Sequence, residues 1–229
     1  MPKTNAVLFD LGGTLVKGSD TFEVAKVYAS IMKKYNVARN LEEIARVYEK
    51  LNTPSLLKKV VLMEGRFWVN FNLLLLKMLN VRENLLEIAD TMDRMWWNHV
   101  NITLYEDTVP TLETLRHNNI VLGVISNSLE NDIENILKLA DIEKFFRIKV
   151  GIDTFKSVKP EKEIFTKTLE KYCLDRSKTL FVGDSLENDY FGALNAGLNA
   201  ILVDRHDKIR KKDVKKIRSL VELTKFCKQ

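Results

Sequence analysis

Chemically reactive side chains stand at four separated points of this 229-residue sequence, each beside a short apolar run or loop dipeptide. Asp10 follows AVLF, Ser126 follows IVLGVI, Lys159 precedes a proline, and Asp184 follows LFVG, with Asp189 shortly after it. A carboxylate can serve as a nucleophile or a metal ligand, a lysine supplies positive charge, and a hydroxyl hydrogen-bonds anionic oxygens. The set therefore combines a nucleophile, a hydroxyl, a cation and metal-type carboxylates.

Each of these motifs also has an ordinary structural explanation. An Asp close to paired glycines, such as Asp10, is a frequent turn former, and Ser126 with Asn127 before a helix is typical of a cap. The acidic stretch GDSLEND could be a helix start that the helix dipole favours. Lys159 followed by proline is ordinary loop sequence. The combination of all four, rather than any one motif, indicates a functional site.

The elements that carry these residues alternate along the chain. We expect apolar strands over residues 6–9, 120–125, 148–152, 179–182 and 200–203, with helices over residues 132–139, 161–172 and 188–196 and in the C-terminal tail. Continuous apolar strands separated by helices are typical of a parallel sheet covered on both faces. Because ligands bind at the carboxyl ends of such strands, the polar clusters are expected to meet at one edge of a Rossmann-like α/β sheet.

Between the first strand and the second half of the chain, the pattern becomes entirely helical. Val24, Tyr28 and Ile31 recur at helical spacing, and similar apolar stripes follow without a strand signal. The strand over residues 6–9 has no partner in such a block, so it must pair within the later sheet. We therefore predict an α/β core of residues 1–17 and 103–229 and an inserted all-helical cap domain of residues 18–102.

The net charge of +5 is concentrated in the tail. Residues 205–229 contain ten Lys or Arg against three acidic residues, a local balance of +7, so the rest of the chain sums to −2. Such a tail could touch RNA or acidic lipids, but Ile217, Leu220 and Phe226 would form the apolar side of an amphipathic helix. We therefore expect a terminal helix with a solvated charged face, and neither a nucleic-acid nor a membrane partner.

The sequence shows no sign of export or of a membrane span. Its longest apolar stretch, residues 73–79, is far shorter than the roughly 20 residues that a spanning helix needs. Residues 1–5 lack the basic start and apolar run of a secretion signal. Cys173 and Cys227 have no metal-type spacing and agree with a reducing compartment. We expect a cytoplasmic protein.

In order and spacing, the four motifs resemble those of the haloacid dehalogenase superfamily, most closely its phosphatases with a helical cap inserted after the first motif. VLFDLGGTL is similar to the first motif, VISNS to the second, Lys159 in VKPEKEIF to the third, and FVGDSLENDYFGA to the fourth. The resemblance covers nearly the whole chain, and the fourth motif is the most specific. It implies a Mg²⁺-dependent phosphomonoester hydrolase for a small phosphorylated metabolite, acting as a monomer or a homodimer.

The resemblance also implies a role for each matching residue. Asp10 would attack phosphorus and form an aspartyl-phosphate that water then cleaves, while Lys159 and Ser126 neutralise and hydrogen-bond the phosphoryl oxygens. The residues implied in metal binding are Asp10, Gly12 through its backbone carbonyl, Asp184 and Asp189. The residues implied in substrate binding are Ser126, Asn127, Gly13 and Thr14.

Gly12 departs from the family pattern, because most phosphatases of this superfamily have an Asp there that protonates the leaving group. Three explanations stay open. The substrate could have a good leaving group, such as an acyl, anomeric or aryl phosphate; another group, such as His99, His206 or a metal-bound water, could replace the acid; or the activity could be vestigial.

Two further functions also stay open. Dehalogenases of this superfamily lack an acid at the same position, since halide leaves without a proton, but they need no metal and would leave Asp184 and Asp189 without a cation between them. A catalytically silent binding or regulatory protein is the remaining alternative.

Overall fold

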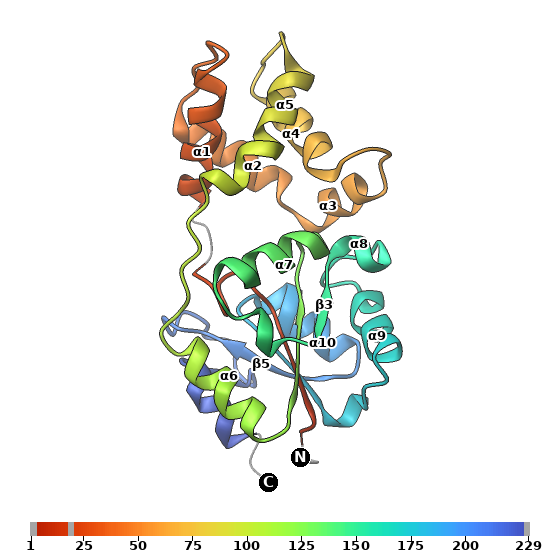
Figure 1. Ribbon diagram of the computed structural model, residues 1–229. Coiled ribbons are helices and arrows are strands. Elements are labelled where there is room, and N and C mark those ends of the chain that lie inside the picture. The colour runs from red at the N-terminus through yellow and green to blue at the C-terminus, as the bar shows by residue number, and fades with distance from the viewer. Residues whose placement is uncertain (1–3, 18–20, 227–229) are drawn as a thin grey trace. The chain divides into compact units, whose positions relative to one another are not determined.

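The computed structural model describes residues 4–17 and 21–226 of the chain (Figure 1). The chain divides into two compact units, one formed by Met1–Gly18 with Ile102–Gln229 and the other by Ser19–Asn101. Residue 18, where the predicted domain boundary falls, lies outside the described residues. No helix in the described ranges is long and apolar enough to cross a bilayer.

The first unit is built on a six-stranded sheet in the order β3-β2-β1-β4-β5-β6, in which every paired strand is parallel. Its strands are β1 Ala6–Phe9, β2 Val121–Ile125, β3 Ile148–Val150, β4 Thr179–Gly183, β5 Asn199–Val203 and β6 Lys216–Ile217. β1 lies between β2 and β4, so a residue that follows β1 emerges in the middle of the sheet edge. The predicted α/β fold class is confirmed.

Helices cover both faces of this sheet. Successive apolar side chains of β1 point to opposite faces, so both faces need a cover. Val7 and Phe9 point into a cluster with buried side chains of α6 Thr108–His117, α7 Glu130–Leu139 and the 3-10 helix η5 Leu220–Lys225. Leu8 points into the opposite cluster, with α9 Lys162–Lys171 and α10 Gly192–Asn195. Both faces of β1 are therefore apolar and covered, and the first polar side chain after it is that of Asp10.

The second unit is helical throughout its described residues. It consists of α1 Thr21–Lys33, α2 Leu41–Leu51, α3 Pro54–Val61, α4 Phe67–Met78, α5 Leu85–Met95 and the 3-10 helix η1 Trp96–Asn98. Its core contains edge-to-face aromatic pairs, with Tyr48 in contact with both Tyr28 and Phe71. The helix α3 begins with a proline in its first turn, a position that favours proline. Apolar spacing alone does not show where α3 begins and ends.

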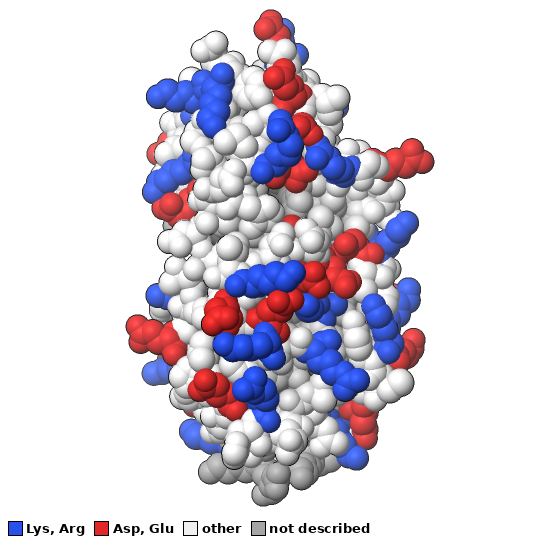
Figure 2. All heavy atoms as spheres, in the orientation of Figure 1, with Lys and Arg blue, Asp and Glu red and all other residues white. Residues whose placement is uncertain are grey.

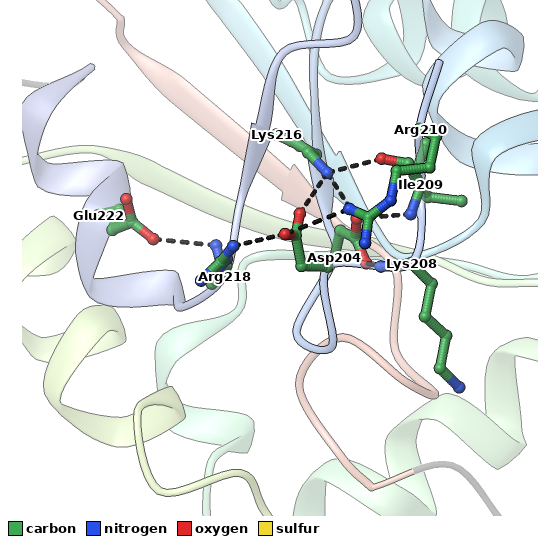
Figure 3. A network of polar contacts seen from close by, with 8 residues as sticks. Asp204, Lys208, Ile209, Arg210, Lys216, Arg218 and Glu222 are labelled. Carbon is green, nitrogen blue, oxygen red and sulfur yellow. Dashed lines mark hydrogen bonds and ion pairs between the residues drawn. The ribbon is translucent and has the colours of Figure 1, made fainter.

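The prediction of an amphipathic helix over the tail is wrong. The described part of the tail forms a loop, the two-residue strand β6 and the six-residue 3-10 helix η5. The loop folds around Lys216, whose ammonium donates to the carboxylates of Asp204 and Asp207 and to the carbonyl of Ile209 (Figure 3). These bonds favour a closed loop over a helix. On the face drawn in Figure 2, basic and acidic side chains are interspersed.

Most other predicted elements differ by one or two residues at an end, and two of them also differ in kind. The strand expected over residues 148–152 ends at Val150, and Ile152–Phe155 forms the short helix α8. The helix expected over residues 188–196 begins earlier, as the π-helix η4 Leu186–Phe191, and continues as α10. Its start is fixed by Ser185, whose hydroxyl accepts a hydrogen bond from the Asn188 backbone N–H.

Candidate active site

Asp10 is the first residue after β1 and stands at the carboxyl end of the sheet between two neighbouring strands. Its backbone N–H donates to the carbonyl of Val182 in β4 at 2.8 Å, which continues the strand pairing up to Asp10 itself. The residue is buried, with 7% of its surface exposed. This arrangement delivers a carboxylate into the middle of the sheet edge on a rigid strand.

Lys159 lies between two buried carboxylates. Its ammonium donates to Asp10 Oδ1 at 2.6 Å and to Asp189 Oδ1 at 2.7 Å, although Asp10 and Lys159 are 149 positions apart in the sequence. Burial by itself lowers the pKa of Lys159, but the charges of Asp10 and Asp189 outweigh it and hold this pKa above its ordinary value. Lys159 therefore stays protonated and supplies a fixed positive charge.

Asp184 completes an acidic cluster with Asp10 and Asp189. One carboxylate oxygen from each residue lies within 4.8 Å of the others, and Asp184 is the exposed member. Loss of surrounding water, together with the neighbouring carboxylates, raises the pKa of Asp10 to about 6 and that of Asp184 to about 7, against the opposing effect of Lys159. A hard divalent cation that prefers oxygen ligands would relieve this repulsion, so the donor set fits Mg²⁺.

Glycines allow the close approach of these carboxylates. Gly13 has a φ of +83°, and a Cβ built there would collide with the Asp184 carboxylate. A Cβ at Gly183 would collide with the Asp189 side chain in the same way. Gly12 is different, because a Cβ built there meets nothing within 4 Å and its φ lies outside the left-handed region. Space therefore exists at Gly12 for the side chain that it lacks.

Asn127 holds the backbone of Lys159. Its side-chain nitrogen donates to the Lys159 carbonyl at 3.0 Å, and its side-chain oxygen accepts from the Lys159 N–H at 2.7 Å. Ser126 is buried, with its backbone N–H bonded to Val150 and its hydroxyl 3.4 Å from that of Ser128. The structure therefore brings the predicted residue Asn127 into the site, but with its amide directed at Lys159.

Thr14 contacts the predicted nucleophile directly. Its hydroxyl donates to Asp10 Oδ2 at 3.2 Å, and its carbonyl accepts from the guanidinium of Arg205 at 2.9 Å. Arg205 belongs to none of the four motifs. The available signal was a basic residue close behind β5, at the same edge of the sheet as the other polar clusters.

The two histidines considered as substitutes for the missing acid are both exposed. His206 lies next to Arg205 in the loop after β5, and His99 directly follows η1 in the helical unit. Within the first unit, the residues that meet around Asp10 are Thr14, Lys159, Asp184 and Asp189. This set can bind a cation, neutralise an anionic substrate and present a carboxylate for attack.

The family of this chain follows from a match over most of its sequence. The family of haloacid dehalogenase-like hydrolases matches residues 7–203, which include all four motifs. The chain belongs to this family. In this haloacid dehalogenase-like hydrolase, Asp10, Ser126 and Asp184 each directly follow a strand of the parallel sheet, and Lys159 contacts Asp10.

Relatives of this hydrolase include pyrophosphatases. It is 32% identical over 99 residues to the pyrophosphatase PpaX of Bacillus mycoides, a match that covers 43% of this chain and only 46% of that protein. It is 29% identical over 185 residues to the pyrophosphatase PpaX of Oceanobacillus iheyensis, covering 78% of this chain and 74% of that protein.

Solved structures share the whole fold of this hydrolase. A HAD phosphatase from Thermococcus onnurineus is 25% identical, with 98% of both chains covered and a TM-score of 0.67. A 2-haloacid dehalogenase from Pseudomonas syringae is 21% identical, with 97% of both chains covered and a TM-score of 0.73. The HAD-hydrolase YfnB from Bacillus subtilis, solved with bound magnesium, is 18% identical, with 99% of this chain and all of that chain covered and a TM-score of 0.71.

Proposed function

We propose that this hydrolase is a Mg²⁺-dependent phosphatase for small phosphorylated metabolites and that it acts through an aspartyl-phosphate on Asp10. The observation that carries the proposal is the Lys159 ammonium, held at 2.6 Å from Asp10 and 2.7 Å from Asp189. Phosphoryl transfer depends mainly on positioning and charge neutralisation, and a buried lysine beside a strand-borne carboxylate supports both.

The proposed metal ligands are the Asp10 and Asp184 carboxylates and the Gly12 carbonyl, with Asp189 close behind them. Asp189 Oδ1 accepts from Lys159 and its Oδ2 accepts from the Ser185 N–H, so its carboxylate orients the site more than it binds directly. When bound, Mg²⁺ supplies charge that neutralises the phosphoryl oxygens. Bound magnesium in the structural neighbour YfnB also supports this assignment.

In the proposed reaction, an Asp10 oxygen attacks phosphorus as the bond to the leaving oxygen breaks, and the bonding electrons depart with the leaving group. Water then attacks the aspartyl-phosphate, which releases phosphate and restores the carboxylate. Lys159 neutralises the oxygens of the transferred group, and the Ser126 hydroxyl donates to them. Thr14 orients Asp10 through its hydroxyl.

The missing acid at Gly12 points to substrates whose leaving group needs no proton. Lys159 holds its proton between two carboxylates, and Thr14 donates its hydroxyl to Asp10, so neither is free to act as the acid. General acid catalysis is worth about 10²–10⁴-fold, which an alkoxide leaving group would lose. Phosphoanhydrides, acyl phosphates and aryl phosphates lose far less. The pyrophosphatase relatives agree with this preference.

A 2-haloacid dehalogenase remains the second candidate, because halide also leaves without a proton and Gly12 suits it. The acidic cluster of Asp10, Asp184 and Asp189 argues against it, since displacement of halide needs no cation there.

Assays of the full chain with p-nitrophenyl phosphate, inorganic pyrophosphate and 2-chloropropionate, each with Mg²⁺ and with chelator, test the proposal. We expect Mg²⁺-dependent phosphate release that Asp10→Asn abolishes. Metal-independent chloride release would transfer the assignment to a dehalogenase. Turnover of none of these substrates would favour a binding protein.

A further inference from the structure

Arg205 joins the loop of the proposed nucleophile to the segment just before α6. Its Nη2 donates to the Thr14 carbonyl at 2.9 Å, and its two Nη atoms bind the Asp107 carboxylate at 2.8 and 3.1 Å. Its guanidinium carbon lies 3.6 Å from the ring centroid of Tyr105. Only 14% of the Arg205 side chain is exposed. The contact to Thr14 spans 191 positions of sequence.

Thr14 carries this contact to Asp10. The residue is fully buried, so its carbonyl has no access to bulk water, and its hydroxyl donates to Asp10 Oδ2 at 3.2 Å. The turn around it is closed by the N–H groups of Leu15 and Val16, which both donate to the Leu11 carbonyl. Arg205 therefore holds the outer side of a turn whose inner side holds the carboxylate of Asp10.

Arg205 is itself fixed from several directions. Besides its two bonds to Arg205, the Asp107 carboxylate accepts from the Ser219 hydroxyl at 2.7 Å and from the Leu220 N–H at 2.8 Å. Asp204, the preceding residue, accepts from two backbone N–H groups of its own loop and from Lys216 (Figure 3). A planar guanidinium can satisfy a carboxylate and a carbonyl at once, whereas a lysine ammonium cannot match this geometry.

We infer that Arg205 is a positioning residue for the reaction. Arg205 orients the Asp10 carboxylate through Thr14, and Asp107 fixes the orientation of the Arg205 guanidinium. The inference rests on the proposed role of Asp10. It assigns a function to the polar contacts after β5 and at the start of α6, both outside the four motifs.

Hydrogen exchange of the full-length protein tests the structural part without any substrate or metal. We expect Arg205→Met to raise amide exchange in a peptide covering residues 10–16 by about 10-fold, because the turn loses its outer hydrogen bond. Arg218→Met is the matched control, since Arg218 belongs to the same C-terminal segment but is itself exposed and pairs with the half-buried Asp207. This control should leave exchange in residues 10–16 unchanged.

Kinetics test the catalytic part. Arg205→Met should lower kcat for p-nitrophenyl phosphate about 10–100-fold with KM changed less than about 3-fold, because a misplaced nucleophile slows the step after binding. Arg205→Lys should recover only a minor part of kcat. In a double-mutant cycle, Thr14→Val should cost much less in the Arg205→Met background than in the wild type, because both residues act on the same carboxylate.

Two results would overturn the inference. One is unchanged exchange in residues 10–16 of folded Arg205→Met; the other is a kcat for this variant equal to that of Arg218→Met. If Arg205→Met does not fold, Asp107→Asn should give a smaller change in the same direction, and wild-type behaviour of that variant would equally contradict the inference. A wild type without phosphatase activity would refute the proposed function, while hydrogen exchange would still decide the structural link.

Discussion

Asn127 and Lys159 are joined by two reciprocal hydrogen bonds, in which the side-chain amide of Asn127 donates to the Lys159 carbonyl and accepts from the Lys159 N–H. The loop after β2 therefore fixes the backbone of the residue whose ammonium lies between Asp10 and Asp189. The position of this charge therefore depends on a side chain that contacts the Lys159 backbone and not its ammonium.

Asn127→Ala should therefore lower kcat about 10–100-fold, because a small displacement of the Lys159 charge weakens stabilisation of the transition state. The unpaired peptide should also cost about 1–3 kcal/mol of unfolding free energy. Steady-state kinetics and urea unfolding measure the two effects. Asn127→Asp keeps the acceptor but loses the donor, so it should also be impaired. Wild-type kcat in both variants would show that Lys159 needs no such support.

Gly12→Asp should restore a proton donor, because a Cβ at this position meets nothing within 4 Å. We expect the rate with an alkyl phosphate to rise about 10–100-fold and that with p-nitrophenyl phosphate to change less than about 3-fold, since the aryl leaving group needs no proton. Gly12→Ala is the control for loss of glycine alone and should resemble the wild type. Equal acceleration of both substrates would remove leaving-group protonation as the explanation.

Gly13→Ala should behave in the opposite way to Gly12→Ala. Gly13 has a φ of +83°, and its Cβ would collide with the Asp184 carboxylate. We expect a lower kcat and a higher Mg²⁺ requirement, measured by titrating Mg²⁺ in the phosphatase assay. Tolerance of Gly13→Ala would contradict the close packing of this loop against Asp184.

Asp184 and Asp189 should differ in their effects on metal binding. Asp184 is exposed and accessible to an ion, whereas both oxygens of Asp189 accept hydrogen bonds from the protein. Asp184→Asn should raise the Mg²⁺ concentration for half-maximal activity about 100-fold, and Asp189→Asn about 10-fold. Calorimetric titration with Mg²⁺ checks the same order without substrate. A larger effect at Asp189 would reverse the two assignments.

Asp107 should stabilise the fold in a pH-dependent way. Burial opposes its charge, but hydrogen bonds from Arg205, Ser219 and the Leu220 N–H outweigh this and lower its pKa below the ordinary value of 3.8. The folded state therefore binds the proton more weakly than the unfolded state, so the stabilisation is present above about pH 4 and is lost as the pH falls through the lowered pKa.

We expect Asp107→Asn to lower the unfolding free energy by about 1–3 kcal/mol at pH 7, with the difference shrinking below about pH 4. Urea unfolding from pH 7 to pH 3 measures it. Asp141→Asn is the control, because the Asp141 side chain is 92% exposed and pairs only weakly with Lys144. A constant difference across this pH range would mean that the Asp107 charge is not the cause.

The sequence was sufficient to predict five of the six strands and the meeting of their polar ends, because both follow from local patterns. Apolar runs such as AVLF define the strands, and the edge geometry of a parallel sheet brings Asp10 and Asp184 together. The family resemblance implied only that Lys159 neutralises the phosphoryl oxygens. Its bond to Asp10 could not be predicted, since these residues are 149 positions apart.

Contacts between distant side chains account for what could not be predicted. The tail has the composition of an amphipathic helix, but Lys216 pairs with Asp204 and Asp207 and folds the backbone into a loop. No local pattern indicates that Arg205 reaches the Thr14 carbonyl. The π-helix η4 was also missed, because the bond from the Tyr190 N–H to the Ser185 carbonyl, five residues back, leaves no sign in the apolar spacing.

The central place of β1 also bears on the order of folding. Ala6 in β1 pairs with Val121 in β2 and with Thr179 in β4. Since β1 comes first in the sequence, it is synthesised before the helical unit and before both of these neighbouring strands. A helical unit of local contacts forms faster than such distant strand pairing, and its early collapse shortens the effective loop that β1 must close. Until β2 and β4 leave the ribosome, the backbone of AVLF has no sheet partner, and the nascent chain exposes it as an aggregation-prone edge.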